Sequence, residues 1–193
     1  MTRAVTGRRP WRRLRGAIRR FRSGRDGATA VEFAMVGMPF FALVCALFEA
    51  GLLLLSQQTL DNALDYAART VFTGTFQEGY DGTPAADRLR RAVCSQVTIF
   101  PCTDVLIDVA TASSFAARSV ASPYDAATKS VAAGFGKTFQ CPSGNDVVTV
   151  RAAVVVPRYF GFLDTDALAI GTTARLVVST VIFRAEPYAT GKC

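Results

Sequence analysis

The sequence predicts an α+β fold in which one long N-terminal helix is followed by a small antiparallel β-sheet module. Residues 29–72 join a long apolar run to apolar side chains at three- and four-residue spacing, which is typical of one continuous helix. Beyond Cys102 the apolar residues follow a period of two, which is typical of strands. At 193 residues, the chain has room for one modest domain with accessory segments.

The N-terminal segment, residues 1–27, is a strongly basic leader. It holds ten arginines and one acid, Asp26, whereas residues 28–193 carry 12 basic and 14 acidic side chains. The net charge of +7 therefore comes from the leader. The rest of the chain has no excess of basic residues, so its charge gives no indication of nucleic-acid binding. Because positive flanks of apolar spans stay in the cytoplasm, we expect the leader there.

Residues 33–55 predict a single membrane span. Their one ionised side chain is Glu49, and at about 1.5 Å per residue they extend about 34 Å, enough to cross a hydrocarbon core of about 30 Å. The run is longer than the core of a cleaved secretory signal, and no small-residue cleavage site follows it. We therefore expect residues 28–73 to form one helix and residues 74–193 to form an extracytoplasmic α+β domain.

The second half of the predicted helix is amphipathic, and its apolar face should pack against the sheet. Asp61, Asp65 and Arg69 lie on another face. Pro39 should kink the membrane half, and Gly74 is the expected end of the helix. The apolar face consists of Leu60, Ala63, Leu64, Ala67, Ala68 and Val71.

The outer domain should contain one short helix and three or more strands. Residues 74–83 are expected as a loop, after which Thr83 caps a helix that starts with Pro84 in its first turn and ends near Val97. The Ser-, Ala- and Gly-rich residues 113–145 should form a long excursion loop. The strands are expected at Val105–Ala112, Val147–Val156 and Ala167–Phe183.

Four of the five cysteines belong to the outer domain, where an oxidising space favours two disulfides. Cys45 lies in the span as a small apolar side chain. Of the three possible pairings we favour Cys94–Cys102, which closes a short loop, with Cys141–Cys193, which holds the C terminus. Zinc is disfavoured because the chain has no CxxC spacing and no histidine.

The lack of histidine also excludes Ser-His-Asp and Cys-His catalysis, so we predict no enzyme, no metal and no cofactor. Tyr159, Phe160 and Phe162 form an aromatic cluster after the second predicted strand. We expect it to pack at the strand end, and an adhesive patch is the other interpretation.

Glu32 is a carboxylate at the start of the apolar run, five residues after Gly27. Its charge costs about 2.5–3.5 kcal/mol at the centre of a bilayer and less near the surface. Cleavage after Gly27 would free the amino group of Ala28, which is at least partly cationic near neutral pH. Pairing of the Ala28 amino group with Glu32 of an adjacent subunit would offset that cost and set the axial stagger between the two subunits. The charge of Glu49 inside the span is unfavourable for the same reason. We therefore expect Glu49 either to be protonated or to face another subunit.

This junction resembles the N-terminal motif of the TadE-like family, whose members are minor pilins, or pseudopilins, of the tight-adherence (Flp) pilus. The likeness covers about residues 20–70, although Ala50 stands where the family usually has leucine. It is carried by Arg25–Ala34, Met38–Phe41 and Leu47–Gly51. The resemblance implies a pilin-like architecture, with Gly27, Ala28 and Glu32 as the processing residues.

The resemblance further implies that a prepilin peptidase removes residues 1–27 at the cytoplasmic face. It implies a single-pass protein of the bacterial inner membrane with a periplasmic outer domain. Other Tad pilus components and pilin subunits would be its partners in pilus assembly and surface adhesion. The alternative is an unprocessed signal anchor, in which Glu32 only reaches the headgroups and the outer domain binds a ligand or surface.

Overall fold

The computed structural model describes residues 27–117, 120–160, 168–188 and 193. The predicted leader before Gly27 and the aromatic Phe162 lie outside the described residues. The chain divides into a first unit that ends at Cys45 and a second unit, Ala46–Cys193. Helix α2 (Ala28–Phe72) begins in the first and ends in the second. A long apolar helix followed by a small antiparallel sheet confirms the predicted α+β class.

In the first unit, the described chain is the strongly apolar part of α2. The helix begins at Ala28, directly after Gly27, and includes Pro39. Large side chains such as Phe33 and Met38 are 73% and 77% exposed. Within the described part of the chain, α2 is the one helix long and apolar enough to cross a membrane, and none of its most apolar window is buried. These properties fit a single-pass membrane protein.

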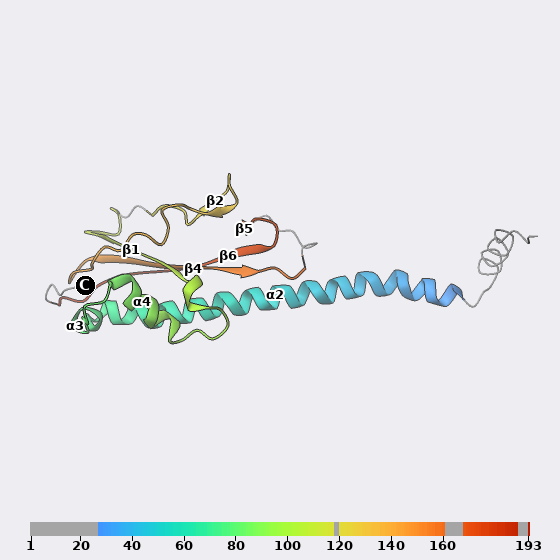
Figure 1. The fold of residues 1–193 in the computed structure, drawn as a ribbon, viewed down its shortest axis with the longest axis horizontal. Coiled ribbons are helices and arrows are strands. Elements are labelled where there is room, and N and C mark those ends of the chain that lie inside the picture. Colours follow the sequence, from blue (N-terminus) through green and yellow to red (C-terminus); the bar gives the residue numbers. More distant parts are fainter. Residues whose placement is uncertain (1–26, 118–119, 161–167, 189–192) are drawn as a thin grey trace, which may run out of the picture. The chain divides into compact units, whose positions relative to one another are not determined.

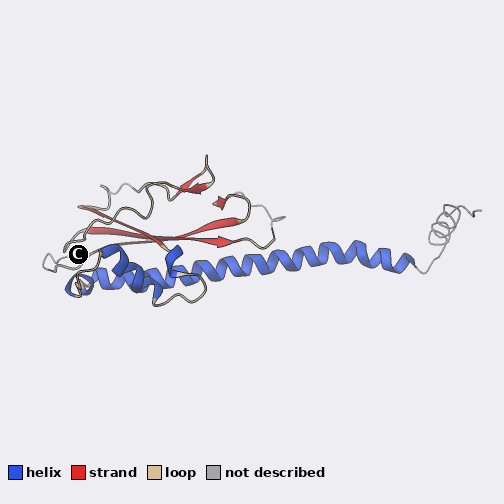
Figure 2. Ribbon diagram, viewed as in Figure 1, coloured by secondary structure: helices blue, strands red, loops and turns tan. Residues whose placement is uncertain are grey.

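The second unit is built on a four-stranded antiparallel sheet in the order β1-β4-β6-β5 (Figure 1). The central strand, β4, pairs with β6 along its whole length. The sheet lies between helices and a long connection, so both faces of β4 are covered and its valines are buried (Figure 2). The strands are β1 (Leu106–Ala112), β4 (Val147–Pro157), β5 (Ala169–Ile170) and β6 (Ala174–Arg184).

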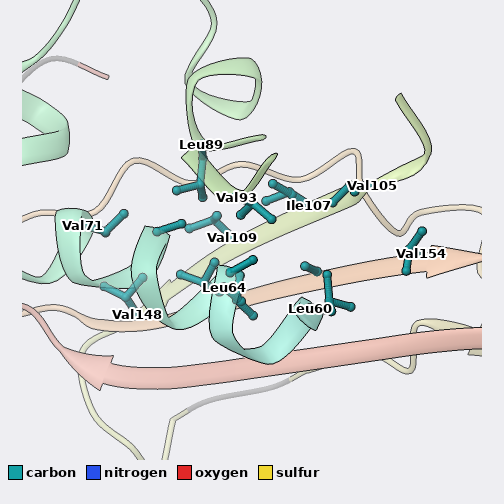
Figure 3. Packing of buried hydrophobic residues seen from close by; sticks show 14 of the residues in the cluster. Leu60, Leu64, Val71, Leu89, Val93, Val105, Ile107, Val109, Val148 and Val154 are labelled. Atoms are coloured by element: carbon teal, nitrogen blue, oxygen red, sulfur yellow. The ribbon is translucent and has the colours of Figure 1, made fainter. Parts of the chain in front are cut away.

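The apolar face of α2 packs on one face of this sheet (Figure 3). The six predicted positions of this face are all buried, as the periodicity requires. Alternate residues of β4, from Val148 to Val154, oppose them, because every second side chain of a strand points to the same face. Leu89 and Val93 of α4 (Ala85–Cys94) join the same core. Helix and sheet therefore share one hydrophobic core.

The opposite face of the sheet is covered by the connection between β1 and β4. The predicted excursion loop, residues 113–145, contains a small hairpin of β2 (Tyr124–Asp125) and β3 (Ser130–Val131). Two-residue strands are too short to show a period of two, which is why the sequence did not reveal them. Phe135 of this connection is buried with Leu176 of β6.

Three local predictions were wrong at element ends. The loop after α2 contains a short helix, α3 (Thr75–Glu78). Thr83 does not cap α4, because Pro84 occupies the cap position. The Thr83 hydroxyl and N–H instead donate to Asp81 at 2.6 and 3.0 Å, and these hydrogen bonds lower the pKa of Asp81 to about 2. The helix also ends at Cys94 rather than near Val97, because the chain must reverse there to close the disulfide.

The predicted third strand is two strands. β5 and β6 are separated by a turn at residues 171–173, in which Gly171 has a φ of +56°. Glycine takes this left-handed conformation without strain, so the chain turns back and β5 pairs with β6. The part of the run before Leu168 lies outside the described residues.

The end of α2 is closed by the C-terminal tail. Gly74 follows the helix with a φ of +83°, which agrees with the predicted stop. The Tyr188 hydroxyl donates to the Val71 carbonyl at 3.2 Å and accepts from Gln77 at 3.1 Å, and burial raises the pKa of this hydroxyl. A Cβ at Gly74 would lie 2.8 Å from the Tyr188 ring. Figure 1 shows the C terminus beside this end of α2.

Candidate assembly and anchoring site

The start of α2 carries the predicted processing residues. Gly27 directly precedes the helix, and apart from its chain neighbours no described residue lies within 4 Å of the position where a Cβ would stand on it. Ala28 and Glu32 are exposed and four residues apart in the helix, so they lie on one helical face, about 6 Å apart along the axis. Gly27 itself is half-buried, and the described residues leave open space where its side chain would stand.

Glu49 has partners inside its own chain. Its Oε2 accepts the backbone N–H groups of Tyr159 at 3.1 Å and Phe160 at 3.0 Å, in the segment directly after β4. Hydrogen bonds to a carboxylate are among the stronger ones in proteins. The sequence predicted that this carboxylate is protonated or faces another subunit, and it did not predict these two donors. The donors lie 110 and 111 residues away along the chain, so no local pattern signals them.

An apolar groove of about 560 Å³ opens beside Glu49 in the second unit. Its walls come from residues 46–56 of α2, the segment 99–104 and the end of β4. Leu52, Leu53, Phe100 and Pro157 line it, together with the charged Asp104, Arg158 and Arg175. The sequence missed this groove because its three walls are far apart along the chain.

The groove has an exposed apolar rim, which we define as Leu55, Ile99 and Tyr159. These side chains are 52%, 45% and 65% exposed. Tyr159 was predicted to pack at the strand end, but its side chain is exposed. Glu49 binds the backbone N–H of Tyr159 rather than its ring. Phe160 is half-buried.

Two disulfides brace the second unit, and they are the pairings that the sequence favours. Cys94–Cys102 bridges the segment that carries Ile99 and Phe100 of the groove wall. Cys141–Cys193 joins the connection before β4 to the C terminus. Cys45 forms no disulfide. Among the described residues, no group of three or more His, Cys, Asp or Glu side chains is placed to hold a metal ion.

Comparison with protein families identifies one segment of the chain. Residues 27–69 match the family model described as TadE-like protein, in agreement with the resemblance of the N-terminal motif. No curated protein and no solved structure matches the chain. The match begins at Gly27 and includes Glu32 and Glu49, whereas the sheet lies outside it. Residues 27–69 are therefore similar to the TadE-like family, and the match does not extend to the rest of the chain.

Proposed function

We propose that this protein is a minor pilin, or pseudopilin, that contributes to assembly of a tight-adherence pilus and so to surface adhesion. The observation that carries the proposal is the TadE-like match, which begins at Gly27, one residue before α2 starts. In this proposal a prepilin peptidase removes residues 1–27. The mature helix then holds the protein in the inner membrane and meets other Tad components there.

The geometry around Gly27 supports processing at this bond. A membrane peptidase needs an accessible bond after a small residue, and Gly27 directly precedes α2 with open space where a side chain would stand. Cleavage would make Ala28 both the new N terminus and the first residue of α2. One helical turn then separates its amino group from Glu32, so a neighbouring subunit displaced by about 6 Å along the axis would align the opposite charges.

The disulfides support a periplasmic second unit. Both are in this unit, and disulfides persist in oxidising compartments such as the bacterial periplasm. The arginines of the leader favour the cytoplasm for the other end of the span. Together they support an orientation with the N terminus inside and the sheet module outside.

The first test is the mass of the mature chain. In cells that contain the Tad prepilin peptidase, we expect intact-protein mass spectrometry of the membrane fraction to find a chain that begins at Ala28. Gly27→Leu should leave the leader attached, because a bulky side chain replaces the small residue before the cut. A wild-type chain that still begins at Met1 or Thr2 would overturn the pilin proposal in favour of an unprocessed signal anchor.

The second test separates processing from assembly. Glu32→Gln should be cleaved normally but enter the pilus or its assembly complex roughly tenfold less, because the lost ion pair is worth about 1.4 kcal/mol or more near the membrane surface. Quantitative immunoblotting of sheared fibres and of cross-linked membranes measures this loss. Glu78→Gln, at an exposed site on α3, is the matched control and should assemble normally. Normal assembly of Glu32→Gln would show that Glu32 does not set the register.

A further inference from the structure

We propose that the groove end of the second unit sits in the headgroup layer of the membrane, and that the hydrocarbon core ends near Glu49 rather than at Leu55. This inference rests on the proposed anchoring of α2 in a bilayer. The partner is the phospholipid surface. The contacting residues are the groove rim and Leu54, which lies next to Leu55 on α2 and is 65% exposed.

The first argument is the depth of the loop that Glu49 holds. Glu49 precedes Leu55 by six residues, which is about 9 Å along a helix. If the hydrocarbon reached Leu55, the backbone at Tyr159 and Phe160 would lie about 9 Å inside it, because both N–H groups are bound to Glu49. Irregular backbone exposed to lipid is not tolerated at that depth, since its polar groups cannot all be satisfied. The hydrocarbon must therefore end at about the level of Glu49.

A shorter span is still long enough. Residues 28–48 cover about 32 Å at about 1.5 Å per residue, which matches a hydrocarbon core of about 30 Å. Glu32 then lies about 6 Å inside the cytoplasmic end of this span, where an unpaired charge is unfavourable. The revised boundary thus agrees with the proposed pairing of Glu32 and the Ala28 amino group.

The second argument is the chemistry of the surface just beyond Glu49. The groove rim and Leu54 expose leucine, isoleucine and tyrosine side chains beside the stretch of α2 from Glu49 to Leu55, which is about 9 Å long. Headgroup layers are roughly 5–8 Å thick on each side of the core and accept partly apolar surfaces, and tyrosine is enriched there. Because α2 continues from its apolar part into the groove wall, this surface follows on from the lipid-facing helix.

The charged residues of the groove are compatible with this position. Arg158 and Arg175 line it and match lipid phosphates in sign. Asp104 has the opposite sign, and Glu49 is held by two backbone N–H groups. The charges balance, so the apolar rim rather than net charge selects the lipid interface. A second copy of this chain would also cover an apolar groove, and the experiment separates the two occupants.

Tryptophan fluorescence in vesicles tests the inference. The sole tryptophan, Trp11, belongs to the leader, so Trp11→Phe provides a background without tryptophan. In this background the full chain receives one probe: Tyr159→Trp at the rim, Phe41→Trp in the span, or Tyr80→Trp beyond α3. Tyr80 is the matched control because it is an exposed tyrosine of the same unit, 46% against 65% for Tyr159. Phosphatidylcholine brominated near the carbonyl end of its acyl chains is the quencher.

We expect Tyr159→Trp to emit at shorter wavelength than Tyr80→Trp and to be quenched at least roughly threefold more, as an interfacial side chain should be. If Phe41→Trp is quenched but Tyr159→Trp behaves like Tyr80→Trp, the inference fails while membrane anchoring stands. If Phe41→Trp is not quenched either, anchoring itself fails. A Tyr159→Trp emission that is blue-shifted but unquenched, with cross-links between copies at this site, would identify a subunit interface and also overturn the inference.

Discussion

Asp108→Ala should lower the free energy of unfolding by about 3–5 kcal/mol, because it leaves a buried arginine without its counter-ion. Asp108 of β1 and Arg151 of β4 are directly opposite in the sheet register, and a carboxylate oxygen lies 2.7 Å from a guanidinium nitrogen. Their side chains are only 7% and 8% exposed. This ion pair is covered by the connection between β1 and β4.

Among the described residues, the Arg151 side chain makes two further contacts, both in that connection. It donates to the Ala121 carbonyl, and its guanidinium lies 5.0 Å from the centre of the Phe135 ring. Neither contact neutralises the charge, so without Asp108 the cation must remain unpaired or draw water into the core. We therefore expect Asp108→Ala to weaken the packing of the β1–β4 connection on this face of the sheet, as well as to destabilise the second unit.

Two controls separate burial from pairing. Asp87→Ala removes an ion pair of the same 2.7 Å length to Arg90, but these side chains are 54% and 30% exposed, so the loss should stay below about 1 kcal/mol. The double variant Asp108→Leu with Arg151→Met removes both charges and should be near neutral. Urea unfolding of the detergent-solubilised chain, followed by circular dichroism, measures all three. Equal losses for Asp108→Ala and Asp87→Ala would contradict the prediction.

Removal of the Cys141–Cys193 disulfide should destabilise the protein by about 4 kcal/mol, against about 2.5 kcal/mol for Cys94–Cys102. The two bonds close loops with sequence separations of 52 and 8 residues. A longer loop restricts the unfolded chain more, so its loss releases more conformational entropy. Paired Cys→Ser variants and urea unfolding under non-reducing conditions measure the difference.

Cys45→Ser is the matched control, because this cysteine forms no disulfide. Its unfolding midpoint in the second unit should equal that of the wild type. A larger loss for the Cys94–Cys102 pair than for the Cys141–Cys193 pair would contradict the loop-length argument. It would show instead that the segment with Ile99 and Phe100 depends on its disulfide for native packing.

Much of the fold follows from periodicity within short stretches. The buried face of α2 was predicted residue by residue, because side chains three and four apart share a helical face wherever the helix packs. β1 and β4 were predicted as strands in the same way, from a period of two. The elements that were not predicted, such as α3 and the β2–β3 hairpin, have two to four residues, which are too short to show either period.

The candidate site also contains some residues that local sequence can indicate and others whose partners depend on the tertiary structure. Gly27, Ala28 and Glu32 could be proposed from the sequence because their proposed chemistry depends on neighbours in the chain: a small residue, a new amino group and a carboxylate one turn later. The partners of Glu49 were not found, because β4 brings Tyr159 and Phe160 to it from more than a hundred residues away.

The sequence by itself determined that a strongly basic segment precedes a long apolar helix, and that a β-rich module with four cysteines follows. Composition and local spacing carry that information. Only the tertiary structure decided that Glu49 binds the loop after β4, that a groove opens beside it, and that Asp108 meets Arg151 inside the sheet. The physical reason is that hydrogen bonds, ion pairs and grooves depend on distances in space, which are set by the register of β1 with β4 and by the packing of α2 against the sheet.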